Sequence, residues 1–151
     1  MTVLDRIDHA IIRAISANGR ISITALADAV GLSKTPCLHR LRRLEGDGYI
    51  LGYTAITDPE KLGAGHIAFV QVRLADTKSA ALDAFNRAVR RIPEIEQCHC
   101  IAGNFDYLLK VRTRDIADYR RVLGEQISNL PHLANTSTFV VIESVVDRHI
   151  G

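Results

Sequence analysis

Apolar residues recur every three or four positions in the first part of the chain, the spacing of helices that bury one side. This pattern predicts three helices, over residues 4–17, 23–30 and 34–45. The segment Tyr49–Thr57 is rich in β-branched and aromatic residues, and Gly52 is placed to turn it, so a short hairpin is expected there. Three helices followed by a β-ribbon is the arrangement of a winged helix-turn-helix.

The second half of the chain mixes strand and helix patterns. His66–Leu74 alternates apolar and polar positions, as a half-buried strand does. The remaining predicted elements are a helix over 82–92, strands over 95–102 and 105–113 with a tight turn at Gly103-Asn104, a helix over 116–127 and a long strand over 136–146. The order βαββαβ predicts a ferredoxin-like domain, a four-stranded antiparallel sheet with both helices on one face. The fold class is therefore α+β.

The sheet face away from the helices is also apolar. The side chains that we expect there are Ile67, Phe69, Phe139, Val141 and Val145. An uncovered apolar face favours dimerisation. The alternative is a monomer with scattered apolar groups on its surface.

A segment rich in Pro and Gly, residues 58–65, separates the two halves. We therefore divide the chain into a helix-turn-helix domain at 1–57, a linker at 58–65 and a ferredoxin-like domain at 66–151. No secretory signal and no membrane-spanning segment are apparent, which favours a cytoplasmic protein.

The turn before the third helix has the residues that a helix-turn-helix needs. Gly31 can adopt positive φ at no steric cost, Ser33 is suited to cap the helix, and Pro36 falls in the first turn, where a missing N–H is tolerated. On a helical wheel, Cys37 and the leucines share one side, and the basic residues occupy the other side and its edges.

Charge supports the same interpretation only locally, because the net charge is +2. Residues 33–43 contain four basic residues and no acid. Such a patch fits binding to double-stranded DNA, although a solvated helix face would look similar. The candidate DNA-binding residues are Ser33, Lys34, Thr35, Pro36, His39, Arg40, Arg42 and Arg43.

Within this set, Thr35 and His39 lie where a recognition helix reads bases. Arg43 could contact a guanine or a phosphate, and Ser33 is favoured as a cap over a base contact. Asp5 and Asp8 are interpreted as first-turn residues favoured by the helix dipole, not as a catalytic pair.

The Cys98-His99-Cys100 run does not predict a metal site. On a strand the two cysteines share one face and His99 points to the other, so the three cannot converge on an ion. Buried thiols are the favoured interpretation, and Cys37, on the inner side of the third helix, is expected to be inert. We expect neither a metal nor a cofactor.

The chain resembles the Lrp/AsnC (leucine-responsive/asparagine-operon regulator) family along nearly its whole length. The residues that carry the resemblance are Leu4-Asp5-Arg6-Ile7-Asp8, Gly19-Arg20-Ile21-Ser22, Val30-Gly31-Leu32-Ser33, Thr35-Pro36-Cys37, Arg40-Leu41-Arg42-Arg43-Leu44-Glu45, Gly48-Tyr49-Ile50, Gly52-Tyr53-Thr54-Ala55 and Gly103-Asn104-Phe105-Asp106-Tyr107-Leu108-Leu109. The resemblance implies a bacterial or archaeal transcription regulator. It also implies that the C-terminal domain binds an amino-acid effector and assembles dimers into larger rings, such as octamers.

By resemblance, the effector lies between dimers, near the glycine turn and the start of the last strand. The candidate effector-binding residues are Gly103, Asn104, Phe105, Asp106, Asn135, Thr136, Ser137 and Thr138. Backbone N–H groups of the turn could receive a carboxylate, and Asp106 could pair with an α-ammonium. The alternative is that Asp106 caps the β-turn.

Two other functions remain open at this point. Some relatives with the same two-domain layout resemble haem-pathway decarboxylases, for which His66, His99 and Tyr107 would be the candidate residues. The basic third helix argues against an enzyme. An RNA-binding module is disfavoured because the sheet lacks exposed aromatic residues beside basic groups.

Overall fold

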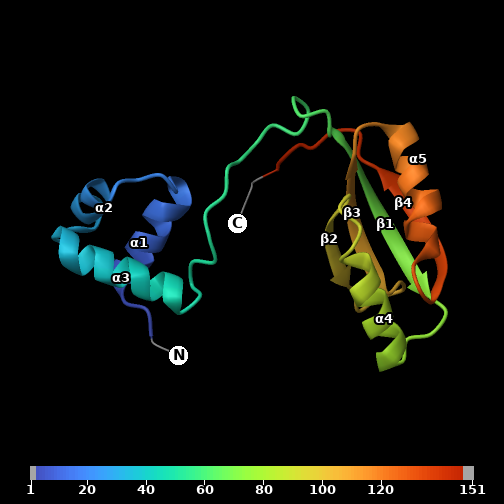
Figure 1. Cartoon of the computed structure of the whole chain (residues 1–151), viewed down its shortest axis with the longest axis horizontal. Helices are drawn as coiled ribbons and strands as arrows, with labels where there is room; N and C mark the ends of the chain where they lie inside the picture. Colours follow the sequence, from blue (N-terminus) through green and yellow to red (C-terminus); the bar gives the residue numbers. More distant parts are fainter. Residues whose placement is uncertain (1–2, 148–151) are drawn as a thin grey trace. The chain divides into compact units, whose positions relative to one another are not determined.

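The computed structural model describes residues 3–147 (Figure 1). Of these, the residues up to Ile56 form one compact unit and those from Thr57 onward form another. Each unit has its own apolar core.

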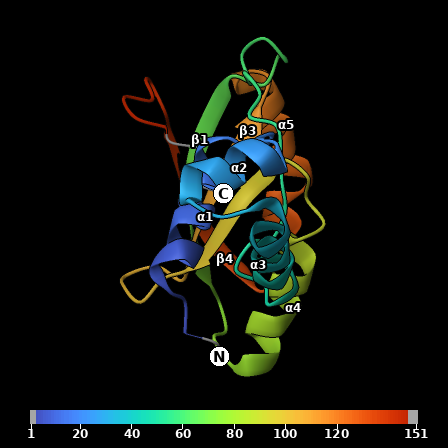
Figure 2. The same ribbon diagram turned by 90° about the vertical axis from the view of Figure 1, so that its left-hand side faces the viewer.

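The first unit is a cluster of three helices (Figure 2). They are α1 (Arg6–Ala17), α2 (Ile23–Val30) and α3 (Lys34–Gly46), which confirms the three predicted helices. Their apolar sides meet in a core built from Ile11, Ile15, Leu26, Ala27, Cys37 and Leu44.

The start of α1 is closed by a reciprocal capping box. The Asp5 carboxylate accepts the N–H groups of Ile7 at 2.8 Å and Asp8 at 2.9 Å. The Asp8 carboxylate in turn accepts the Asp5 N–H at 3.1 Å. Asp8 is therefore a first-turn residue, as predicted, whereas Asp5 is the N-cap residue just before the helix, and two amides that the helix leaves unpaired are satisfied.

The turn between α2 and α3 is made by Gly31, which has a φ of 71° and ends α2, as predicted. Ser33 occupies the N-cap position of α3, but its side chain makes no capping hydrogen bond. That part of the cap prediction was wrong. The third residue of the helix is Pro36, so the N–H that such a cap commonly binds is missing.

The hairpin predicted for Tyr49–Thr57 does not form, because residues 51–57 contain no strand. Leu51 and Ile56 are largely exposed, and an isolated ribbon without an apolar surface to cover is only marginally stable. The segment is instead tethered by Tyr53, whose hydroxyl donates to the Glu45 carboxylate at 2.6 Å.

The second unit has the predicted βαββαβ order. Its elements are β1 (His66–Leu74), α4 (Ser79–Val89), β2 (Ile95–Cys100), β3 (Tyr107–Thr113), α5 (Ile116–Glu125), the short 3₁₀ helix η1 (Ile127–Asn129) and β4 (Leu133–Val140). The four strands form an antiparallel sheet in the order β2-β3-β1-β4. This is the ferredoxin-like arrangement.

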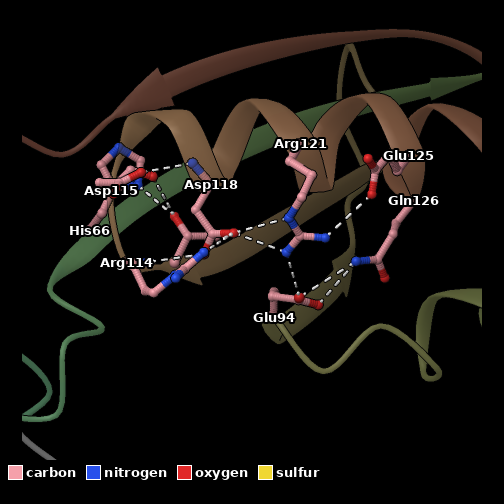
Figure 3. A network of polar contacts seen from close by, with 9 residues as sticks. His66, Glu94, Arg114, Asp115, Asp118, Arg121, Glu125 and Gln126 are labelled. Carbon is pink, nitrogen blue, oxygen red and sulfur yellow. Dashed lines mark hydrogen bonds and ion pairs between the residues drawn. The ribbon is translucent and has the colours of Figure 1, made fainter.

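Helices α4 and α5 cover one face of this sheet. The alternate β1 residues Ala68, Val70 and Val72 are buried in a core with Phe85 of α4 and Val122 of α5. An ion-pair network extends along the outer side of α5 (Figure 3). In it, Asp118 contacts Arg114 and Arg121, and Arg121 also contacts Glu94.

The opposite face of the sheet, which we call the open face, carries the other β1 residues. They are Ile67, Phe69, Gln71 and Arg73. The strand register places Phe139 beside Phe69 on this face, and the Val141 N–H donates to the Ile67 carbonyl at 2.9 Å. The apolar character predicted for this face is therefore present.

Two local predictions, for the last strand and for the Gly103-Asn104 turn, need correction. The last strand spans Leu133–Val140, earlier than predicted, and residues 141–147 continue without strand structure. The tight turn at Gly103-Asn104 is a longer loop over 101–106, closed by a hydrogen bond from the Ile101 N–H to the Asp106 carbonyl at 2.9 Å. The segment 58–65 contains hydrogen-bonded turns, and the Asp58 carboxylate accepts two backbone N–H groups within it.

Candidate functional site

The third helix buries one side and presents another to solvent. Cys37 and Leu44 are fully buried against α1 and α2. The exposed residues of the predicted DNA-binding set are Ser33, Lys34, Thr35, Pro36, His39 and Arg42. The helix therefore exposes a polar surface along its length.

Arg40 and Arg43 do not belong to this exposed surface. Nη1 of Arg40 lies 2.6 Å from Oδ2 of Asp5 and 2.9 Å from Oδ1 of Asp8. Nη2 of Arg43 lies 2.6 Å from Oδ2 of Asp8. The structure thus ties both arginines to acids at the start of α1, a pairing that the sequence analysis did not predict.

This four-residue ion cluster is partly removed from water. The Asp8 side chain is 1% exposed, whereas Arg40 and Arg43 are 28% and 31% exposed. Burial raises the pKa of Asp8, but hydrogen bonds from the Asp5 backbone and from the two arginines outweigh it and lower that pKa below its ordinary value. The carboxylate is therefore charged at neutral pH. Hydrogen bonds to Asp5 and, next, to Asp8 raise the pKa of Arg40.

The sequence contained a signal for this cluster. Asp5 and Asp8 lie at the start of α1, and no Lys or Arg lies three or four positions after either of them. An ion pair within the helix therefore cannot account for both acids. Their partners lie more than thirty residues away. Only the packing of α1 against α3 shows the pairing.

The other basic side chains of α3 have no partner among the described residues. The side chains of Lys34, His39 and Arg42 make no hydrogen bond or ion pair to any of residues 3–147. With Thr35 they form what we call the α3 surface. It contains two fixed positive charges, an imidazole and a hydroxyl, all suited to phosphate oxygens or base edges.

The loop 101–106 meets the end of β1. The Asp106 N–H donates to the Val72 carbonyl at 2.9 Å, and Oδ2 of Asp106 accepts the Leu74 N–H at 2.8 Å. The carboxylate therefore bonds β1 instead of capping its own turn. Gly103, Asn104 and Phe105 belong to the same loop, and the first two of these residues are exposed.

The four candidate residues of β4 are divided between the two faces of the sheet. Asn135 pairs with Arg73 and Ser137 with Gln71, on the open face. Thr136 pairs with Val72 and Thr138 with Val70, on the helix face. There the Thr138 hydroxyl lies 2.5 Å from the Tyr119 hydroxyl. Asn135 and Ser137 therefore share the open face with Arg73 and Gln71, and the two threonines do not.

The residues considered for a haem-pathway enzyme do not come together. His66 pairs with Thr113 and Tyr107 with Val72, so the two lie at opposite ends of the β1–β3 pair, about 20 Å apart at the usual rise per residue. His99 pairs with Leu108 on the open face. This separation removes the geometric basis for a shared catalytic site.

In the Cys98-His99-Cys100 run, the prediction of buried thiols was wrong for Cys100, which is exposed, and Cys98 is only partly buried. Cys98 packs against the core beside Leu109, and burial, with a smaller contribution from Cys100, raises its pKa to about 11. Burial also raises the pKa of the Cys37 thiol. Within residues 3–147, no group of three or more His, Cys, Asp or Glu side chains is arranged to hold a metal ion.

Among the same residues, no helix is both long and apolar enough to cross a membrane.

A helix-turn-helix with free basic groups on α3, followed by a ferredoxin-like domain, defines the class of DNA-binding transcriptional regulators with a ligand-binding domain.

Comparison with known proteins shows the family. Residues 4–50 match the winged helix-turn-helix DNA-binding model, and residues 67–150 match the Lrp/AsnC ligand binding domain. The chain belongs to the Lrp/AsnC family and is a regulator, not an enzyme.

Curated relatives match almost the whole chain. It is 59% identical over 147 residues to a proline dehydrogenase transcriptional activator of Rhizobium radiobacter, with 97% of this chain and 94% of the relative covered. It is 46% identical over 142 residues to the leucine-responsive regulatory protein of Escherichia coli K12, with 94% and 87% covered.

Solved structures agree with this assignment. An AsnC family transcriptional regulator from Agrobacterium tumefaciens matches with a TM-score of 0.92 at 31% identity, covering 97% of this chain and 95% of the other. A transcriptional regulator from Neisseria meningitidis in complex with L-methionine matches with a TM-score of 0.91 at 28% identity and the same coverage.

Proposed function

We propose that the chain is a cytoplasmic regulator that binds double-stranded DNA through the α3 surface and is controlled by an amino-acid effector. The observation that supports this assignment is the division of basic groups on α3. Lys34, His39 and Arg42 have no partner in the described chain, whereas Arg40 and Arg43 are held by Asp5 and Asp8.

In this proposal the DNA-binding domain is 1–57 and the effector domain is 66–151, joined by the segment 58–65. Thr35 and His39, near the start of α3, are the residues proposed to read base edges. Lys34 and Arg42 contact phosphates, with Ser33 and Pro36 close to the backbone. Arg40 and Arg43 act indirectly, because they fix α3 against α1.

The effector is proposed to bind where loop 101–106 meets β1 and the start of β4. The L-methionine complex of the Neisseria regulator supports an amino acid as the ligand. The similarity to proline dehydrogenase activators supports a proline dehydrogenase gene as the target and activation as the sign of regulation. Proline, the substrate of that enzyme, is then the first effector to test.

The apolar part of the open face is proposed as the contact of a homodimer, and dimers associate further, as octamers by family resemblance. Ile67 and Phe69 line an open groove of about 420 Å³ with Lys110, Val141 and residues 143–147. Phe139 is 52% exposed, Val145 is 84% exposed, and both lie outside any core. A second copy would cover these groups.

The test of DNA binding is an affinity measurement on the DNA upstream of the proline dehydrogenase gene, at several salt concentrations. Arg42→Ala is expected to weaken binding and to reduce the salt slope by about 1, because one phosphate contact is lost. Arg120→Ala, at an exposed position of α5, is the matched control. Unchanged affinity and salt slope for Arg42→Ala together with Lys34→Ala would refute the proposed surface.

The test of effector binding is a thermal-shift screen with the twenty amino acids. A ligand that binds only the folded protein raises its Tm. If no amino acid shifts the Tm or changes DNA affinity, the effector part of the proposal fails.

A further inference from the structure

Arg73, near the end of β1, is an exposed cation without a protein partner. Two other cations of the open face have protein partners: Lys110 lies 3.3 Å from Glu96, and Arg112 contacts Glu96 and the Ala64 carbonyl. The Arg73 side chain has no hydrogen bond or ion pair to any residue that the structure describes. Its charge is therefore available to an anion.

Arg73 lies between two candidate effector residues. On one side, Asp106 is bonded to the residues that flank Arg73, through the Val72 carbonyl at 2.9 Å and the Leu74 N–H at 2.8 Å. On the other side, Asn135 pairs with Arg73 in the β1–β4 register. At about 4.8 Å between strands, Asp106, Arg73 and Asn135 form a row about 10 Å across.

The open face changes in character along β1. Next to the Arg73 row are Gln71 and its partner Ser137, both polar. The following pair is Phe69 with Phe139, and beyond it Ile67 is bonded to Val141. The apolar end suits a protein partner, whereas the polar end offers charge and hydrogen bonds to a small ligand.

The row is complementary to a zwitterion. Oδ2 of Asp106 accepts the Leu74 N–H, and Oδ1 has no hydrogen bond or ion pair to the described residues. A carboxylate with one free oxygen suits an ammonium group, and a guanidinium binds a carboxylate in bidentate fashion. The two opposite charges lie on neighbouring strands, which matches the short distance between the charged groups of an α-amino acid.

We propose that Arg73 binds the α-carboxylate of the amino-acid effector while Asp106 holds its α-ammonium group. Asn135 adds an amide hydrogen bond to the carboxylate. This inference rests on the proposed function and names the residue that recognises the invariant part of the ligand. Side-chain selectivity then falls to the neighbouring row, Gln71 and Ser137.

The experiment uses the full-length protein and the amino acid that gives wild type its largest thermal shift in the screen. Kd is measured by calorimetry for this amino acid and for its α-carboxamide, which lacks the negative charge. We expect Arg73→Gln to weaken binding of the amino acid at least tenfold, the scale of a lost charge-assisted hydrogen-bond pair. Wild type is expected to prefer the acid over the amide by a similar factor, and Arg73→Gln to lose this preference.

Arg120→Gln is the matched control and is expected to bind like wild type. DNA affinity without effector should be the same in all three proteins, which shows that the variants are folded. If wild type responds to an amino acid and Arg73→Gln binds it with unchanged Kd and unchanged preference over the amide, this inference is overturned while the proposed function stands. If wild type responds to no amino acid, both fail.

Discussion

The Asp8 carboxylate lies 2.6 Å from the Arg43 guanidinium, and it is the most buried member of a cluster that joins the first turn of α1 to the recognition helix α3. The same carboxylate contacts Arg40 at 2.9 Å. One acid therefore holds two of the arginines that a sequence-based interpretation assigns to DNA. In the proposed function, their effect on DNA binding passes through the position of α3.

Asp8→Asn is expected to destabilise the first unit by about 2 kcal/mol, because it leaves the partly buried Arg43 guanidinium without its anion and leaves Arg40 with Asp5 alone. DNA affinity should fall as well, but the salt slope should stay near that of wild type, since no phosphate contact is removed. Urea denaturation and salt-dependent binding measure the two effects. Asp28→Asn, at an exposed position of α2, should stay within about 0.5 kcal/mol of wild type. A salt slope reduced by about 1 or more in Asp8→Asn would contradict the indirect role of the arginines.

Acidic pH is expected to weaken the second unit through Asp118. Hydrogen bonds from Arg114 and Arg121 lower the pKa of Asp118 from 3.8 to about 2. A lowered pKa in the folded state means that the ion pairs stabilise the fold above pH 3.8, and that this contribution is lost as the pH falls from 3.8 toward 2. NMR titration of the carboxylate carbon measures this pKa.

Added salt should move the Asp118 pKa back toward 3.8, because these surface ion pairs are screened. Arg114→Gln should raise the pKa in the same direction. An Asp118 that titrates near 3.8 at low salt in wild type would show that the network in Figure 3 is not formed in solution.

Phe139→Asp is expected to reduce the subunit number. The ring lies on the open face beside Phe69, and a charge at this position would be buried if a second copy covered the face. Size-exclusion chromatography with light scattering gives the mass. Ser137→Asp, two residues earlier on the same face of β4, is the comparison at the polar end of that face. It should keep the wild-type mass at a protein concentration at which wild type is fully assembled. An unchanged mass for Phe139→Asp would place the subunit contact elsewhere.

Gly31→Ala is expected to cost about 1 kcal/mol of stability, because Gly31 has a φ of 71°, where a side chain is strained even though a Cβ would meet nothing within 4 Å. Gly46→Ala, at the end of α3, is the control, because it also has open space but no positive φ. It should be neutral or slightly stabilising, since alanine favours the helix. Equal effects of the two substitutions in chemical denaturation would argue against the left-handed turn.

The sequence pattern predicted the helices and most of the strands, because periodicity reports which side of an element is buried. It was less successful where an element depends on a neighbour. Residues 51–57 have strand propensity but no surface to cover, and Leu51 stays exposed. The last strand ends at Val140, where its pairing with β1 ends, although apolar residues continue to Val146.

The candidate DNA-binding residues fall into two groups, those exposed on α3 and those held by acids of α1. Lys34 and Arg42 are exposed on α3, and the helical wheel had put Arg42 at an edge of the polar side. Arg43 was placed opposite the apolar side, yet it is held by Asp8 of α1. A long arginine side chain reaches several ångströms in any direction, so its partner depends on which helix packs beside it.

By itself the sequence determined the two-part architecture, the glycine turn before α3 and the family, because these depend on local conformation and on the order of residues. The tertiary structure decided which basic groups are free. It also placed Arg73 between Asp106 and Asn135, which are distant in sequence. Both results depend on packing and strand register between remote segments, and no local pattern specifies these.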